Sequence, residues 1–450
     1  MLRWSWIAVG VWVWCGLAAP APAQEEPRAV VLITFDSVRP DHVGFFGWHR
    51  PTTPAIDAFL SASAVFERTY SPVTSSFGAH LSVLSSSSPV EHALVSLGPP
   101  RSPWKPSSAV SSVAEHLAGQ RYRCAAFVST RHIGTWSGLQ AGFHTLDEPA
   151  ESVREPSEIA ALAERWLEVH AKEQRIFLWL HFKGGQEPNL PVMPYMTMFQ
   201  NDEACSRAID AIGTPPERFN QGGFSNQILI RMFFPELEGM VTPKGMRLQD
   251  VDRAAVERLY NRYDGDLRAT DDAVQRVLAK LEQTGLAART VVAMCSVTGQ
   301  AFGEQTMLGR GEVTREVAQV FAAVRAPGLA PRRSSEVVSL VDLMPTALAH
   351  AGLGAKASFG RGLDVLATPR THAFVMRPTR EGERNPPGPI YALYSKRWKL
   401  VHRPERTDQL FDLESDPREA HDVLKEHPDE AAALRAIVQA ELAKGAPSAK

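Results

Sequence analysis

An aspartate at the end of an apolar run is the feature of this sequence that points most directly to chemistry. Asp36 follows the run Ala-Val-Val-Leu-Ile-Thr-Phe that begins at Ala29. The polar residues that come next are Ser37, Arg39, Asp41 and His42. A continuous β-branched and aromatic run is typical of a strand buried on both faces, and ligands of open α/β sheets bind just beyond the carboxyl ends of such strands. The position of Asp36 therefore predicts a site for a metal ion or an anionic substrate.

The rest of the chain alternates between segments with the patterns of strands and of helices. Short apolar runs predict strands at residues 122–129, 176–182, 290–296 and 317–324. Capping residues and apolar residues at helical spacing predict helices at residues 53–60, 157–173, 248–281 and 339–351. This alternation predicts an α/β fold in which a mostly parallel sheet is sandwiched by helices.

The pattern changes beyond residue 368. Short strands, a turn and a closing amphipathic helix are predicted there, at residues 374–376, 390–394, 398–402, 408–416 and 428–443. We therefore expect a small α+β subdomain at 368–450 after an α/β domain at 24–367. Residues 188–244 lack periodicity and are rich in Met, Phe and Gly, which predicts an insertion over the carboxyl edge of the sheet.

Composition and the first residues indicate an exported globular protein. The 450 residues are 44% hydrophobic and 22% charged, and the net charge of -2 gives no electrostatic case for nucleic acid. Arg3, the apolar run at 6–19 and the small residues of Ala21-Pro-Ala23 predict a signal peptide at 1–23, and hence a periplasmic or extracellular protein. The apolar run is shorter than the ~20 residues of a membrane span, and no second such run follows. We therefore expect no transmembrane anchor after signal removal.

The number and positions of the cysteines do not indicate a disulfide framework. Removal of the signal leaves Cys124, Cys205 and Cys295, which allow at most one internal disulfide. Cys124 and Cys295 lie in strand-like runs and are predicted to be small core residues.

Several segments, in order and spacing, resemble the sulfatase family of the alkaline phosphatase superfamily. They lie at residues 31–42, 50–54, 66–72, 259–286, 291–304, 317–328, 339–346, 396–400 and 410–417. The resemblance implies the fold of that family. It also implies a cysteine or serine that is oxidised to formylglycine, whose hydrate attacks sulfur, and a divalent cation, commonly calcium, held by acidic residues from two strand ends.

The nucleophile segment departs from the family's pattern. The resemblance places Ser76 at the nucleophile and His80 at the family's arginine or histidine, whereas Gly78 and Ala79 replace the proline and serine of the motif. Because the motif is broken, we expect Ser76 to remain unmodified, as a polar residue at a helix start.

The metal segments depart further. Asp36 is kept, but Ser37 stands where the family has a second aspartate, and Val297 and Thr298 replace the aspartate and histidine of the second segment. One carboxylate is too few for a calcium site built from ~6–8 oxygens. We therefore expect no bound metal or other cofactor, and Asp36 as a remnant held by hydrogen bonds to neighbouring backbone or hydroxyl groups.

Two further segments also lack polar residues that the family has at its site. Lys183-Gly-Gly-Gln186 replaces an Asp-Pro-His of many relatives, and Gln305 and Arg310 replace histidines. These losses fall on separate elements that would meet at one site, while the apolar strands are kept. The pattern indicates a retained scaffold with a dismantled site.

Two functions remain open. The first is an exported sulfatase-like protein without activity that binds or assembles with an anionic or sulfated small molecule or glycan, or with another protein. The cations expected to bind such a ligand are Arg39, Lys183 and Arg310, with His42, His80 and Lys399 as further candidates.

The second is an active hydrolase of sulfate or phosphate esters with calcium or another divalent cation. It would need new ligands from the insertion, such as Asp202, Glu203 or Asp210, because the fold alone does not confer activity. The acidic residues of the predicted helix at 248–281 are interpreted instead as a solvated face with capping and salt-bridge positions; they are Asp264, Asp266, Asp271 and Asp272.

Overall fold

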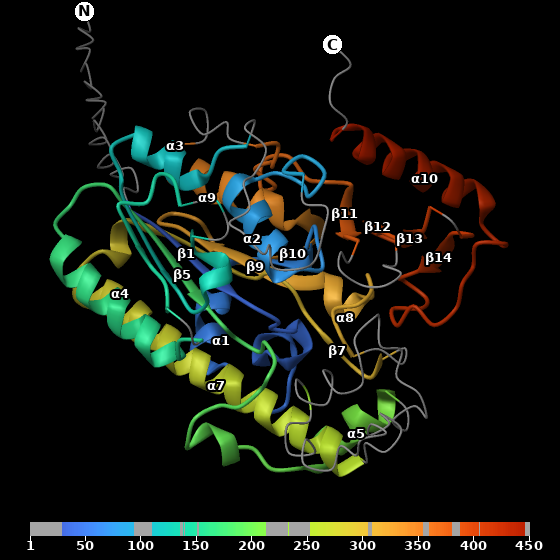
Figure 1. The fold of residues 1–450 in the computed structure, drawn as a ribbon, viewed down its shortest axis with the longest axis horizontal. Coiled ribbons are helices and arrows are strands. Elements are labelled where there is room, and N and C mark those ends of the chain that lie inside the picture. Colours follow the sequence, from blue (N-terminus) through green and yellow to red (C-terminus); the bar gives the residue numbers. More distant parts are fainter. Residues whose placement is uncertain are drawn as a thin grey trace, which may run out of the picture.

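The fold is known from a computed structural model (Figure 1). The residues it describes are 29–93, 110–135, 138, 140–150, 153–212, 233, 253–304, 308–353, 360–379, 388–404 and 406–445. The predicted signal at 1–23 and much of the predicted insertion, from residue 213 on except for Phe233, lie outside these residues.

The main sheet has eight strands in the order β10-β2-β9-β6-β1-β5-β3-β4. Their bounds are β1 Ala29–Phe35, β2 Ala64–Tyr70, β3 Arg123–Val128, β4 Thr145–Asp147, β5 Ile176–Phe182, β6 Thr290–Ser296, β9 Gln319–Arg325 and β10 Arg332–Ser339. The central strand β1 runs parallel to both β5 and β6, whereas β9 runs antiparallel to β6 and β2. The predicted α/β fold with a mostly parallel sheet is confirmed.

The register of the three central strands sets where the site forms. Phe35 ends β1 level with Phe182 of β5 and Ser296 of β6. All seven residues of each of these strands are buried, because helices cover both faces of the sheet. The segments that follow the three strands therefore leave the core side by side at one edge.

Helices form a layer on each face of the sheet (Figure 1). On one face, α4 and α7 pack against each other, and their Ile159 and Leu259 belong to the same core as Ile33 of β1. On the other face, Leu81 of α2 and Leu348 of α9 belong to the same core as Leu32. Successive side chains of β1 point to opposite faces of the sheet and thus pack in two separate cores. The helices are α1 Pro54–Ser61, α2 Ser76–Ser85, α3 Val113–Gly119, α4 Pro156–His170, α5 Glu203–Ile212, α7 Arg253–Gln283, α8 Arg315–Ala318 and α9 Leu343–His350.

A separate antiparallel sheet follows near the C-terminus. It consists of β11 His372–Arg377, β12 Ile390–Ser395, β13 Trp398–His402 and β14 Gln409–Asp412 in chain order. The helix α10, Pro428–Ala443, packs Leu434 and Val438 onto Leu393 and Leu400 of this sheet. The small α+β unit expected from the sequence is present, beside the main sheet in Figure 1.

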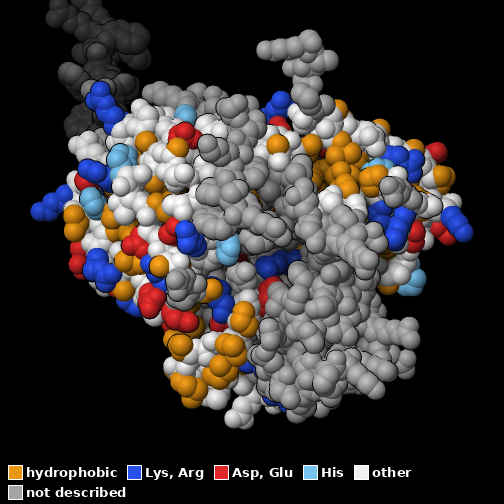
Figure 2. Space-filling model, in the orientation of Figure 1, with side chains coloured by type: hydrophobic (Ala, Val, Ile, Leu, Met, Phe, Trp, Pro, Cys, Tyr) orange, Lys and Arg blue, Asp and Glu red, His pale blue; other side chains and the backbone are white. Residues whose placement is uncertain are grey.

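The three cysteines Cys124, Cys205 and Cys295 are buried and free, so no disulfide joins them. Within the described ranges, no helix is both long enough and apolar enough to cross a bilayer. Figure 2 shows acidic and basic side chains interspersed over the described part of one face, in keeping with the net charge of -2.

The interpretation of the acidic residues of α7 as a solvated face is wrong for Asp264, Asp266 and Asp271, whereas the expected capping and salt-bridge positions are present. Asp264 and Asp271 are fully buried and Asp266 is nearly so. Asp271 accepts hydrogen bonds from the backbone N–H groups of Ala55 at 3.0 Å and Ile56 at 2.8 Å. Both N–H groups belong to the first turn of α1, where the helix itself offers them no backbone acceptor. The N-cap residue Thr53 makes no side-chain capping hydrogen bond, so Asp271 takes that role.

Asp264 and Asp271 thus bind donors of the segment after β1. Asp266 binds Asn189 and Lys183 of the segment after β5, and the partly exposed Asp272 pairs with Arg268 of the same helix.

Replacing Asp271 with Ala should destabilise the protein by about 1–3 kcal/mol, because two buried N–H groups at the start of α1 lose their acceptor. Urea unfolding measures the change. The control is Gln275→Ala, an exposed position on the same helix, which should change the free energy of unfolding very little. Equal effects of the two substitutions would contradict a capping role for Asp271.

Candidate functional site

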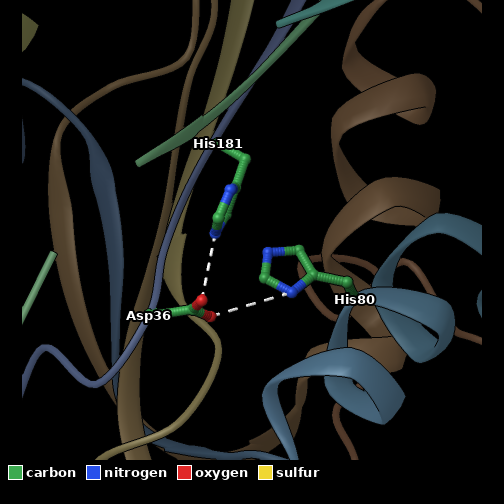
Figure 3. Close-up of side chains that lie close together, drawn as sticks. All are labelled: Asp36, His80 and His181. Atoms are coloured by element: carbon green, nitrogen blue, oxygen red, sulfur yellow. Dashed lines mark hydrogen bonds and ion pairs between the residues drawn. The ribbon is translucent and has the colours of Figure 1, made fainter. Parts of the chain in front are cut away.

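Asp36 lies directly beyond β1, fully buried, where the register brings three strand ends together. Its backbone N–H donates to the carbonyl of Phe182 at 3.2 Å. Its carboxylate accepts a short hydrogen bond from the hydroxyl of Ser76 on Oδ1 and lies 3.1 Å from Nε2 of His181 through Oδ2. Figure 3 shows the carboxylate between His181, from β5, and His80, from α2.

Ser76 and His80 lie one turn apart at the start of α2. Ser76 is the first residue of this helix, half-buried, and His80 lies one turn later and is buried. The Nδ1 atom of His80 lies 2.8 Å from the carbonyl oxygen of Ser76 and 3.8 Å from Oδ1 of Asp36. The two candidate residues of the nucleophile segment thus meet Asp36 from one helix turn.

The proton positions on His181 follow from its partners. Its Nδ1 accepts a hydrogen bond from the backbone N–H of Ser129 at 3.2 Å. The hydroxyl of Ser129, which can donate or accept, also lies 3.0 Å from Nδ1. In the tautomer that accepts the backbone N–H, Nδ1 carries no proton and the proton of the neutral ring is on Nε2. The Nε2–H group therefore donates to Asp36.

His80 is fixed in the same way. The carbonyl of Ser76 can only accept, so Nδ1 of His80 carries the proton. Its Nε2 lies 3.1 Å from the hydroxyl of Thr34, which also accepts from the indole N–H of Trp179 at 3.0 Å. In the neutral ring Nε2 accepts from that hydroxyl. The lone pairs of both rings are therefore used by other groups and point away from the carboxylate.

The charge states agree with these partners. Burial favours a neutral Asp36, but His181, His80 and the hydrogen bond from Ser76 outweigh it and lower the pKa of Asp36 to about 2. Burial lowers the pKa of His80 to about 4, in spite of the nearby Asp36. At neutral pH the site thus holds one carboxylate and a neutral His80.

The positions of the other expected metal ligands are filled differently. The hydroxyl of Ser37 accepts from Nη1 of Arg310 at 2.8 Å, and Nη2 of Arg310 donates to Glu187 at 2.9 Å. Val297 is fully buried and donates its backbone N–H to Phe35. The hydroxyl of Thr298 is buried and has no partner among the described residues.

The loop after β5 is built on glycines. Gly184 has a φ of +59°, and its added Cβ would lie 2.5 Å from the carbonyl oxygen of Asp36. The next residue, Gly185, donates its N–H to the same oxygen at 2.9 Å. The loop therefore packs so closely on Asp36 that a side chain at either position would displace it.

The cations expected to bind an anion are each paired with a carboxylate. Arg39 is buried and bound to Asp41 and Glu304, at 2.6 Å each. Lys183 lies 3.7 Å from Asp266. The structure thus brings Arg310 and Lys183 to the loop beside Asp36, with their charges already partnered.

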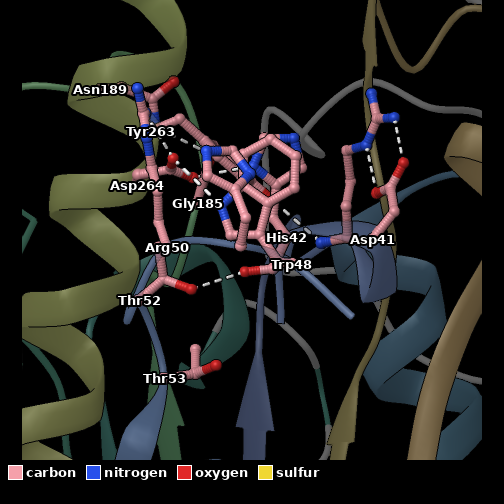
Figure 4. A network of polar contacts seen from close by, with 12 residues as sticks. Asp41, His42, Trp48, Arg50, Thr52, Thr53, Gly185, Asn189, Tyr263 and Asp264 are labelled. Carbon is pink, nitrogen blue, oxygen red and sulfur yellow. Dashed lines mark hydrogen bonds and ion pairs between the residues drawn. The ribbon is translucent and has the colours of Figure 1, made fainter. Parts of the chain in front are cut away.

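Lys399 and His42, the further candidates for anion binding, belong to other networks of ion pairs and hydrogen bonds. Lys399 is buried against Glu419 in the C-terminal unit. His42 contacts Asp264 at 2.8 Å, and Asp264 also accepts from Trp48 and Arg50, as Figure 4 shows. These residues join the segment after β1 to α7.

The acidic residues of the insertion do not form a metal site either. Asp202 binds His49 and Arg50, Glu203 binds Arg207, and Asp210 binds Arg253. Within the described ranges, the group of acidic or histidine side chains with metal-ligand spacing is Asp36, His80 and His181.

The sequence reasoning missed His181 as a site residue. It is the polar residue in the otherwise apolar run of β5, and the register places it beside Thr34 of β1. A histidine in a strand buried on both faces needs polar partners, and this was the signal available in the sequence.

Comparison with known proteins identifies the family. A sequence model of the family described as Sulfatase matches residues 28–353, which is more than half of the chain. The chain belongs to the sulfatase family.

Individual sulfatase relatives are distant. A choline-sulfatase of Rhizobium meliloti (strain 1021) is 26% identical over 176 residues, which are 38% of this chain and 34% of that protein. The match therefore spans about a third of that relative's length.

Solved structures share the fold. A phosphonate monoester hydrolase of Agrobacterium radiobacter has a TM-score of 0.69 at 17% identity, and covers 93% of this chain and 96% of its own. A protein solved with its substrate D-glucosamine-2-N,6-O-disulfate has a TM-score of 0.70 at 16% identity, over 95% and 100% of the two chains.

Sulfatases usually use a divalent metal, and the residues here do not supply the oxygen ligands of a hard cation. Asp36 is the one carboxylate in the group of Asp36, His80 and His181, which is too few for such an ion. A metal-bound histidine ligates through one nitrogen and usually donates a proton from the other. Ligation through Nε2 of His181 would put the ring proton on Nδ1, directed at the hydroxyl of Ser129 at 3.0 Å, and would lose the hydrogen bond from the backbone N–H of Ser129.

The pH dependence of stability should report on His80. Its folded pKa of about 4 lies below the 6.5 of a free histidine, so the unfolded chain binds a proton that the folded chain does not, and stability falls as pH drops from about 6.5 to 4. The difference corresponds to about 3 kcal/mol at pH 4. Urea unfolding of His80→Gln should lose this part of the slope, whereas His421→Gln, at an exposed position, should keep it. A full slope in His80→Gln would contradict a buried neutral imidazole.

Proposed function

We propose that this protein is an exported member of the sulfatase family without ester hydrolase activity, which binds an anionic or sulfated small molecule or glycan. The observation that carries the proposal is the set of donors around Asp36. Ser76 and His181 each direct a proton to its carboxylate, and both imidazole lone pairs are engaged elsewhere. A hard cation that polarises the ester would find one carboxylate ligand in this arrangement.

The nucleophile position supports the same proposal. The hydroxyl of Ser76 donates to Asp36, whose pKa of about 2 makes it a very weak base. A serine without a base or a metal is a poor nucleophile. The broken motif at Gly78 and Ala79 argues against conversion of Ser76 to formylglycine.

Arg310 is the group best placed to meet an anion. Its side chain is 18% exposed, and it donates to Ser37 directly beside Asp36. An incoming sulfate would displace the carboxylate of Glu187 and accept the hydrogen bond from the Arg310 guanidinium in its place. The relative solved with a sulfated glucosamine suggests this ligand class for the first test. Export is proposed from the N-terminal sequence.

An active hydrolase with an altered site is the second candidate. The observation in its favour is the contact of the Ser76 hydroxyl with a carboxylate, which is the arrangement of a nucleophile and its base. The low pKa of Asp36 argues against it, and a direct assay separates the two functions.

The exported protein should show no turnover of aryl sulfates, phosphate monoesters or phosphate diesters, with or without added calcium, magnesium, manganese or zinc. Metal analysis should find far less than one ion per chain, and peptide mass spectrometry should find Ser76 as serine. Turnover that Asp36→Ala abolishes, and that Glu426→Ala at an exposed position preserves, would establish the hydrolase instead.

Binding of sulfate should depend on the pair of Arg310 and Glu187. Glu187→Gln removes the competing carboxylate and should tighten binding of inorganic sulfate or sulfated glucosamine by about tenfold, or about 1.4 kcal/mol. Arg310→Met should weaken it by at least as much, and Arg165→Met, at an exposed arginine of α4, should leave it unchanged. Titration calorimetry measures all three. Unchanged affinity in both site variants would remove Arg310 from the proposal.

A further inference from the structure

A cavity lies apart from the Asp36 site. It has a volume of about 620 Å³ and lies between η1 (Pro40–His42), α5, α7, α8 and residues 418–420. Its described lining includes Trp48 and Tyr260, and includes none of Asp36, Ser76 and Arg310. Small-molecule sites usually enclose about 300–1,000 Å³. The cavity is therefore large enough for a ligand of its own.

One wall of the cavity carries an unpaired acid. Oε2 of Glu316 is buried and has no hydrogen-bond partner among the described residues. The nearby cation Arg39 is already bound to Asp41 and Glu304. Burial, with Glu304 as a further cause, raises the pKa of Glu316 to about 7. A buried carboxylate oxygen without a donor is costly, so this wall favours a ligand that donates hydrogen bonds and carries positive charge.

Another wall carries a cation with neutral partners. Arg315 donates from Nε to the amide oxygen of Gln319 at 2.8 Å and from Nη1 to the carbonyl of Pro417 at 3.1 Å. Among the described residues, none of the acceptors of its side chain is a carboxylate. This guanidinium favours a ligand with a negative group, for which it has donors in a planar arrangement.

The lining is balanced in charge. Its formal cations are Arg39, Arg315 and Arg418, and its formal anions are Asp41, Glu304 and Glu316. Three positive and three negative charges give a formal sum of zero, so neither a simple anion nor a simple cation is favoured overall. A ligand with one charge of each sign complements Glu316 and Arg315, whose side chains form no direct ion pair among the described residues.

A metal ion fits these residues less well. Within the described part of the chain, the acidic groups of this cavity do not come together as a set of three ligands with metal spacing. The aromatic side chains of Trp48 and Tyr260 on its lining suit an apolar group better than a hydrated ion.

We propose that this cavity binds a small zwitterion of the α-amino acid class. The ammonium group donates to Oε2 of Glu316, and the carboxylate accepts from the guanidinium of Arg315. The apolar side chain of the ligand packs against Trp48 and Tyr260. The ligand thereby joins α8 to the segment after β1.

Titration calorimetry of the full exported protein with each of the proteinogenic amino acids tests the proposal. We expect at least one to bind with a Kd below about 1 mM. Glu316→Gln and Arg315→Met should each weaken it at least tenfold, while acetate and methylammonium alone bind more than tenfold more weakly than the amino acid. Arg165→Met serves as the control, and thermal melting verifies that each variant is folded.

The proposal is overturned if no amino acid binds at about 10 mM, or if binding survives both Glu316→Gln and Arg315→Met. Equal binding of acetate alone would show a plain anion site and would also overturn it. The result is independent of the sulfate experiment, because Arg310→Met should leave amino acid binding unchanged.

Discussion

A carboxylate that is buried and ionised must be surrounded by groups that stabilise its charge, and this constraint governs the site at the edge of the main sheet. Asp36 has no exposed surface, yet its pKa is lowered to about 2. A hydroxyl from α2 and an imidazole from β5 direct protons to its two oxygens. In this structure side-chain protons stabilise the charge. The orientation of His181 in turn depends on Ser129, whose backbone N–H and hydroxyl face Nδ1 of that ring.

The scaffold and the site obey different requirements. Level register of β1, β5 and β6 places three strand ends side by side whatever chemistry follows them. Burial of both faces of these strands keeps that geometry stable through apolar packing alone. Residues at the edge can therefore vary without loss of the fold. Val297, buried directly after β6, packs at this edge and has no atom that could bind a metal.

Much of the fold could be predicted from periodicity, because a strand buried on both faces and an amphipathic helix have distinct patterns. The strands at 176–182 and 290–296 and the helix at 428–443 have the predicted bounds. The polar edge strand β10, with the sequence Arg-Arg-Ser-Ser-Glu-Val-Val-Ser, was missed because it has little apolar pattern. The buried acids of α7 were misread because their partners come from residues about 200 positions away, such as Ala55 and Ile56 for Asp271.

The sequence by itself determined the α/β class, the family likeness and the residue types at the expected metal-ligand positions, since these depend on residue types and their order. Only the tertiary structure decided what Asp36 contacts. Hydrogen-bond partners are set by which strands are neighbours and by their register, and His181 lies 145 positions from Asp36 in the chain. The tertiary structure likewise decided that Arg39, Lys183 and Arg310 are paired, because an ion pair requires two side chains to meet in space.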